Sequence, residues 1–147
     1  MKRSIGEPIV LTHLKMVEHL AKRIGDEHLK QIDLTQSQAD VIILLAHESG
    51  KVFRQRDIEI ALNYSNPTVT GLLNRLEQKG FIVRRVDPED SRARIISLTN
   101  KALEIIEEIY QSIRRTEQML LDGFSEEEIE ILQPLMSRIA KNALRHM

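Results

Sequence analysis

Residues 65–80 are Ser65-Asn66-Pro67-Thr68-Val69-Thr70-Gly71-Leu72-Leu73-Asn74-Arg75-Leu76-Glu77-Gln78-Lys79-Gly80. This stretch predicts a helix with a marked start and a marked end. Ser65 can cap the start by accepting backbone N–H bonds, Pro67 fits the first turn, and Gly80 suits a left-handed end. Helical spacing places the apolar residues on one face and the polar ones on the other. The apolar face holds Val69, Leu72, Leu73 and Leu76, and the small polar face holds Thr68, Thr70, Gly71, Asn74, Arg75 and Gln78.

Helices also precede this stretch. Residues 55–62 predict a short helix, and Thr35 with Gln38 forms a capping-box pair for a helix that ends near Gly50. Further upstream, apolar residues recur at three- and four-residue steps, which predicts a first long helix. These residues are Ile9, Val10, Leu14, Val17, Leu20, Ala21 and Ile24.

The residues after Gly80 predict a β-hairpin and two more helices. Strands are expected over 81–86 and 95–98, joined by a turn at 87–90 with Pro88 at its second position. Thr99 is a plausible cap for a long helix that extends to Leu121, and Ser125 with Glu128 forms a second capping box. The predicted fold class is therefore mainly α, with about six helices and one hairpin.

A short helix followed by a capped helix with a small polar face is typical of a helix-turn-helix, whose second helix enters the major groove of DNA. Asn and Arg side chains can bond base edges there, and a bidentate pair contributes roughly 1–3 kcal/mol of base discrimination. The candidate DNA-binding residues on this helix are Ser65, Asn66, Pro67, Thr68, Thr70, Asn74 and Arg75.

The hairpin offers a second set of candidate contacts. Arg92 and Arg94 are long cations that can follow the phosphates into the minor groove. Asp90 lies two residues before Arg92 and could hold its guanidinium by a charge-assisted bond. Amphipathic helices and Arg-bearing hairpins are each common as plain surface elements, so only their fixed order favours DNA binding.

Charge motivates an alternative function. The net charge is −1. This charge is also compatible with a winged-helix module that binds an acidic protein partner and not DNA. The positive charge is nevertheless concentrated: residues 51–94 hold nine Lys and Arg against six Asp and Glu. A protein-binding surface would favour exposed aromatic residues, which make up only 3% of this chain. Charge placement therefore favours DNA.

Short motifs along almost the whole chain resemble the MarR (multiple antibiotic resistance regulator) family. The hairpin motif is the most specific of them, because its spacing and its residue types match together. The matching segments are Leu34-Thr35-Gln36-x-Gln38, Gln55-x-x-Ile58, Pro67-Thr68-Val69-Thr70, Leu76-Glu77-x-Lys79-Gly80, Asp87-Pro88-x-Asp90-x-Arg92 and Leu98-Thr99.

The resemblance implies a dimeric winged helix-turn-helix regulator of transcription, formed by residues 1–147 as a single domain. The DNA-binding lobe would span about residues 34–99, and the dimerisation helices about 8–32 and 100–146. The recognition helix would correspond to about Ser65–Lys79, with Asp90 and Arg92 at the wing tip. Many members respond to small phenolic or lipophilic ligands, so a small aromatic or lipophilic effector is expected.

Assembly can also be predicted from the residues themselves. The helix over 103–121 and the terminal helices carry more apolar surface than a winged helix alone can cover, which predicts a homodimer. A two-fold dimer with recognition helices about 34 Å apart requires a near-palindromic operator with half-sites about 10 base pairs apart.

Two positions depart from the family pattern. Arg54 stands where a Ser or Thr cap is expected, and Ala102 stands where a glycine is common. A phosphate contact is one hypothesis for Arg54, and a solvated arginine is the more common outcome.

Other chemistry finds little support in the sequence. There is no cysteine, and no motif for a nucleophile, a phosphate loop or an acid/base pair is present, so no enzyme, cofactor or metal site is predicted. His13, Glu18 and His19 are close in sequence but lack metal-ligand spacing. The longest apolar run, Val41–Ala46, is too short to cross a membrane, and a cytoplasmic protein is expected. Residues that could line an effector pocket, although they are more often core, are Met16, Phe53, Tyr110, Met119 and Met136.

Overall fold

The computed structural model describes residues 8–48 and 50–147, so residues 1–7 and 49 of the predicted domain lie outside it. The described chain is mainly helical, as predicted, with one small sheet. In chain order the elements are α1 (Ile9–Leu29), the short 3₁₀ helix η1 (Lys30–Ile32), α2 (Gln36–His47), β1 (Phe53–Arg54), α3 (Gln55–Leu62), α4 (Asn66–Gln78), β2 (Ile82–Asp87), β3 (Asp90–Leu98), α5 (Asn100–Glu104), α6 (Ile106–Leu120) and α7 (Glu126–Arg145).

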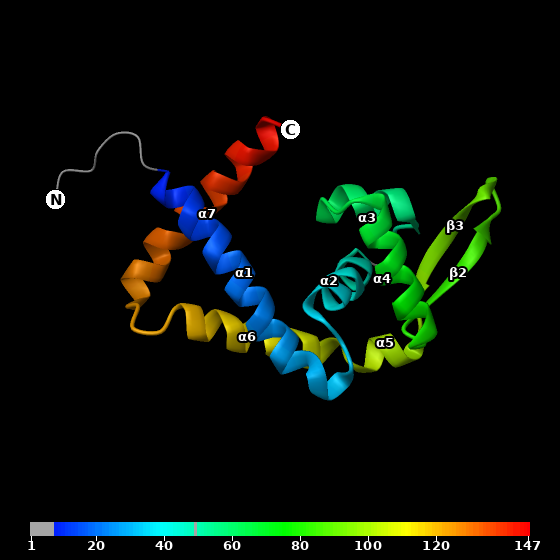
Figure 1. The fold of residues 1–147 in the computed structure, drawn as a ribbon, viewed down its shortest axis with the longest axis horizontal. Helices are drawn as coiled ribbons and strands as arrows, with labels where there is room; N and C mark the ends of the chain where they lie inside the picture. Colours follow the sequence, from blue (N-terminus) through cyan, green and yellow to red (C-terminus); the bar gives the residue numbers. More distant parts are fainter. Residues whose placement is uncertain (1–7, 49) are drawn as a thin grey trace.

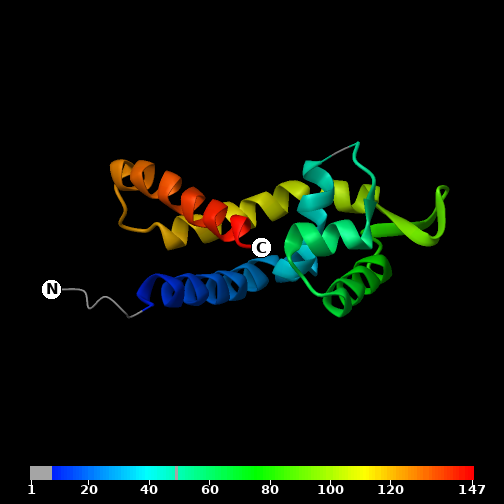
Figure 2. The ribbon, with the colours of Figure 1, turned by 90° about the horizontal axis from the view of Figure 1, so that it is seen from above.

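The elements form two groups at opposite ends of an elongated molecule (Figures 1 and 2). The helices α1, α6 and α7 make up one end. The helices α3 and α4 and the β2–β3 hairpin make up the other, and the hairpin projects outward (Figure 1). Helix α2 lies between them and contacts α1 and α6 as well as α3, α4 and β3.

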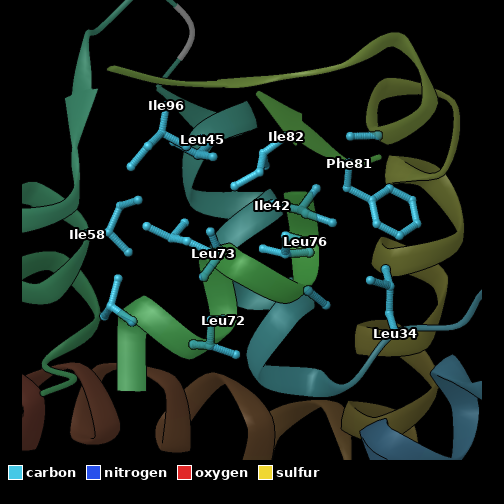
Figure 3. Packing of buried hydrophobic residues seen from close by; sticks show 14 of the residues in the cluster. Leu34, Ile42, Leu45, Ile58, Leu72, Leu73, Leu76, Phe81, Ile82 and Ile96 are labelled. Carbon is cyan, nitrogen blue, oxygen red and sulfur yellow. The ribbon is translucent and has the colours of Figure 1, made fainter. Parts of the chain in front are cut away.

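The core of the winged end lies between α2, α3, α4 and the sheet (Figure 3). Ile42 of α2, Ile58 of α3, Leu73 and Leu76 of α4 and Ile82 of β2 are at most 1% exposed. The four residues predicted for the apolar face of α4 are all buried. Because burying one such side chain stabilises the fold by roughly 1.5–3 kcal/mol, this face holds the polar face of α4 toward solvent.

The predicted helix caps are present. The Oγ atom of Ser65 accepts the backbone N–H of Thr68 at 3.3 Å, and Gly80 ends the turn after α4 with φ of 81°. Such a cap contributes about 1 kcal/mol. The capping boxes of α2 and α7 also form as predicted, with all four bonds between 3.1 and 3.2 Å.

The hairpin forms as predicted, but the sheet is larger. Strand β3 begins at Asp90 rather than near residue 95, and the strand order is β1–β3–β2. Phe53 and Arg54 of β1 pair with Ile96 and Ile95 of β3. A strand of two residues has no periodicity of its own, so only the folded neighbour defines it.

The prediction of one continuous helix after Thr99 is wrong, because the helix is interrupted at Ile105. Thr99 caps the short α5, and the N–H of Ile105 bonds to the carbonyl of Ala102 at 3.2 Å, three residues back. Helix α6 then starts at Ile106. Both Ile105 and Ile106 are partly buried and pack against the core.

The long helices leave an apolar surface uncovered. A groove of about 550 Å³ lies between α1, α6 and α7, lined mainly by apolar side chains from all three. Exposed apolar residues on these helices include Val10, Leu11, Met16, Val17, Met119, Leu120, Ile131, Leu135, Met136 and Ile139. Within residues 8–48 and 50–147, no helix is both long enough and apolar enough to cross a membrane.

Candidate nucleic-acid interface

The polar residues predicted on α4 lie at the surface. Thr70 is half-buried, and the remaining six are exposed. The exposed residues are Ser65, Asn66, Pro67, Thr68, Asn74 and Arg75. Because the opposite face of α4 is buried, this surface can approach a partner without the helix having to move.

The hydroxyl groups at the start of α4 hold one another. Ser65 donates from Oγ to the Thr68 Oγ1 at 2.8 Å while it caps the helix. Thr70 is held differently: its Oγ1 accepts the Nε2 group of Gln55, on α3, at 2.8 Å. Gln55 was not among the predicted site residues. Only the packing of α3 beside α4 places it next to Thr70.

Asn74 is tied to the wing. Arg84, on β2, donates from Nη2 to the Asn74 Oδ1 at 2.9 Å, and it also bonds both carboxylate oxygens of Glu77 at 3.0 Å. The Arg84 guanidinium holds the pKa of the Glu77 carboxyl below its usual value. The recognition helix and the wing are therefore joined through the residue expected to contact a base.

Two cations of α4 and the wing are used within the protein. Arg84 is the first, and Lys79 is the second, with its Nζ bonded to the carbonyl oxygen of Asp33 at 2.6 Å and to the Gln38 Oε1 at 3.1 Å. Four other arginines of α4 and the wing form no ion pair among the described residues, and all are exposed. They are Arg75 on α4, Arg85 on β2, and Arg92 and Arg94 on β3.

The outer end of the wing carries Arg92 outside the strand pairing. Val86 pairs with Arg94 and Asp87 with Asp90, so residues 91–93 have no counterpart on β2. Asp90 and Arg92 are exposed here, as is Arg94 one residue beyond the unpaired segment. This irregularity frees Arg92 from the flat ladder and lets its side chain reach outward.

Asp90 acts differently from the prediction. Its Oδ1 accepts the backbone N–H of Arg92 at 3.0 Å, and no ion pair joins the two side chains among the residues described. The carboxylate therefore fixes the backbone at Arg92 rather than its guanidinium, because the turn places the N–H group within reach.

Arg54 is bonded within the protein, although its side chain is 40% exposed. Its Nε donates to the Asp87 Oδ2 at 2.6 Å, and Asp87 is 2% exposed. The backbone N–H of Glu89 and the Arg54 guanidinium hold the pKa of the Asp87 carboxyl below its usual value. The helix cap of α3 comes instead from Asp57, which accepts the Arg54 backbone N–H at 2.8 Å. Arg54 thus anchors the outer end of β2 to the start of α3.

A separate cavity of about 330 Å³ lies between α1, α2, α6 and the loop that carries Tyr64. Asp40 stands in its wall, accepting the Gln36 Nε2 at 2.9 Å and the Tyr64 hydroxyl at 3.4 Å. Burial raises the pKa of Asp40 and also that of Tyr64. The other lining residues are Glu18, Ala21, Lys22, Ile113, Thr116, Glu117 and Leu120.

The pocket residues suggested by the sequence do not line this cavity. Phe53 is in the core, Tyr110 is half-buried, and the three methionines are exposed on the long helices. Met136 lines the groove between α1, α6 and α7, whereas Met16 and Met119 do not line it. Within residues 8–48 and 50–147, no three His, Cys, Asp or Glu side chains gather in a way that could hold a metal ion.

Comparison with known proteins adds to this geometry. The model of the MarR family matches residues 32–93, which include α2, α3, α4 and most of the wing. The fold is similar over 99% of the chain to a crystal structure of MarR, with 25% identity, 97% of that chain covered and a TM-score of 0.85.

Two structures of MepR from S. aureus are similar as well. The MepR–DNA complex has 29% identity and a TM-score of 0.80, with 96% of this chain and 99% of that chain covered. MepR in its DNA-binding conformation has 30% identity and a TM-score of 0.74, with 91% and 98% covered.

Proposed function

Because the chain belongs to the MarR family, we propose that it is a sequence-specific regulator of transcription that binds double-stranded DNA and represses by occupying its operator. One observation carries the proposal: the small exposed face of α4 lies next to a wing on which Arg85, Arg92 and Arg94 form no ion pair among the described residues. Helix α4 would enter the major groove, and Arg92 and Arg94 would reach the neighbouring minor groove. MepR, which resembles this chain, has been solved with DNA.

The same surface suits a protein partner less well. An interface core is usually rich in aromatic residues and poor in charges, whereas the exposed residues here are Thr, Asn, Ser and Arg. Phe53, which pairs with β3, and Phe81, which comes directly before β2, are both only 2% exposed. The protein-interaction module is therefore not favoured.

The regulator would act as a homodimer through α1, α6 and α7. Their uncovered apolar side chains form a larger patch than single surface residues do, and such patches mark interaction sites. Two copies related by a two-fold axis would bind a near-palindromic operator. Access to DNA implies a cytoplasmic location, and the role requires no catalytic group or cofactor.

A small aromatic or lipophilic effector would bind in the cavity between α1, α2 and α6, which links the dimerisation helices to the DNA-binding lobe. Its volume of about 330 Å³ is at the lower end of ligand pockets. Three carboxylates against one lysine in its wall favour a ligand with a positive charge over a phenolate or a carboxylate.

Benzyltrimethylammonium should therefore raise the melting temperature of the protein more than benzoate does at equal concentration. The reverse order would contradict the assignment of a cationic ligand to this cavity.

Selection of bound fragments from random duplex DNA tests the function. We expect enrichment of one near-palindromic sequence, with affinity at least about 10³-fold above that for scrambled duplex. Recovery of fragments without a common sequence would contradict sequence-specific regulation. Repeating the selection with benzyltrimethylammonium tests the effector proposal separately from the DNA-binding proposal. Only effector binding depends on the cavity.

A further inference from the structure

The side-chain amide of Asn74 can have only one orientation beside Arg84. The Arg84 Nη2 donates to the Asn74 Oδ1 at 2.9 Å. A guanidinium carries N–H donors and no acceptor, whereas an amide has a carbonyl acceptor at one end and an NH₂ donor at the other. Turning the amide over would bring two donors together. The carbonyl of Asn74 therefore faces Arg84, and its NH₂ group is the end left for an external partner.

Arg84 is itself fixed. It makes two 3.0 Å bonds to the carboxylate of Glu77, which lies three residues after Asn74 and so on the same side of α4. Paired guanidinium and carboxylate groups form short, directional bonds. Arg84 is also only 24% exposed, which limits its freedom to swing away. The strand β2 thus holds the amide of Asn74 on α4 in one orientation.

We infer that Arg84 is a positioning residue that makes Asn74 a hydrogen-bond donor toward the bases, and this inference rests on the proposed DNA-binding function. In the major groove G, A and T each present an acceptor, whereas C presents only its N4 amino donor. The position that Asn74 contacts should therefore accept G, A or T and reject C. The bidentate Asn–adenine pair suggested by the sequence would need the amide oxygen to accept a second hydrogen bond beside the one from Arg84.

The test compares four duplexes that differ at a single base. Selection with the wild type and with Asn74→Ala identifies the position whose preference depends on Asn74. At that position wild type should bind the duplex carrying C at least about fivefold more weakly than the best of the others. Asn74→Asp keeps an oxygen toward Arg84 but presents a second oxygen outward. This variant should prefer C, since a carboxylate accepts from the N4 group.

The role of Arg84 needs a matched control. Arg84→Gln and Arg85→Gln each remove one positive charge from β2, but only the first releases the amide of Asn74. Both should bind all duplexes more weakly, and only Arg84→Gln should lose the rejection of C. Arg84→Lys should restore it, because an ammonium group is also a pure donor. Circular dichroism and thermal unfolding establish that each variant is folded.

The possible outcomes separate this inference from the proposed function. Wild-type preference for C at the Asn74 position, no position that depends on Asn74, or equal discrimination by Arg84→Gln and Arg85→Gln would each overturn the inference while DNA binding stands. Failure of the wild type to select any duplex would overturn the proposed function, and the inference with it.

Discussion

At the scale of single residues, changing Arg92 should affect DNA affinity in general, whereas changing Asn74 should affect selectivity for one base. Arg92 projects from the unpaired segment of the wing and would anchor by charge. Arg92→Ala should weaken binding to selected and scrambled duplexes alike, and it should lower the slope of log affinity against log salt by about 1 per wing. A salt titration measures both quantities, with Arg23→Ala on α1 as a control of equal charge. An unchanged slope would mean that the wing does not contact DNA.

Changing Asp90 should lower DNA affinity less than changing Arg92 does. Its carboxylate holds the backbone N–H of Arg92, so Asp90→Ala leaves the cation in place but frees the backbone that positions it. Affinity should fall less than in Arg92→Ala, and the salt slope should stay close to that of wild type. The same titration checks this, and a slope reduced as far as in Arg92→Ala would contradict the backbone role.

Asp87 makes part of the stability depend on pH. Its pKa in the folded protein is lowered, mainly by the Glu89 N–H and by Arg54, so its contribution is present above the unfolded pKa of about 3.9. That contribution disappears as pH falls through the folded pKa. The difference in unfolding free energy between wild type and Asp87→Asn should therefore be largest near neutral pH and shrink below about pH 4. Denaturant unfolding at several pH values measures it, and a difference that grows toward acid pH would be inconsistent with this sign.

At the scale of elements, the cap of α4 is a local device whose energy can be isolated. Ser65→Ala removes the oxygen that accepts the Thr68 N–H and should destabilise the protein by about 1 kcal/mol. Ser97→Ala, at an exposed position of β3, should change stability by less than about 0.5 kcal/mol. Urea unfolding of both variants gives the comparison. Equal effects would show that Ser65 does not stabilise the helix.

Local signals predicted most of these elements, because a cap, a turn and an amphipathic period act within a few residues. Ser65, Pro67 and Gly80 marked the limits of α4 for that reason. Interactions between distant residues were beyond the sequence: β1 exists only through β3, and Arg54 meets Asp87 across 33 positions. The pairing of Arg84 with Asn74 likewise depends on how the wing folds against α4.

At the scale of the whole molecule, the proposed homodimer would cover the apolar surface of α1, α6 and α7. Met136 lines the groove between these helices and is 42% exposed. Wild type should be a dimer at micromolar concentration, and Met136→Glu should shift it toward monomer, because a charge would be buried without a partner. Val52→Glu, an exposed position in the winged end, should leave the dimer intact. Light scattering distinguishes these states, and a monomeric wild type would contradict the dimer.

Hydroxyl-radical footprinting of the protein on its selected duplex tests the central claim most directly, namely that two copies bind one operator through α4 and the wing. We expect two equivalent protected regions, related by two-fold symmetry and centred about 10 base pairs apart on one face of the duplex. A single protected half-site, or uniform protection along the DNA, would contradict it.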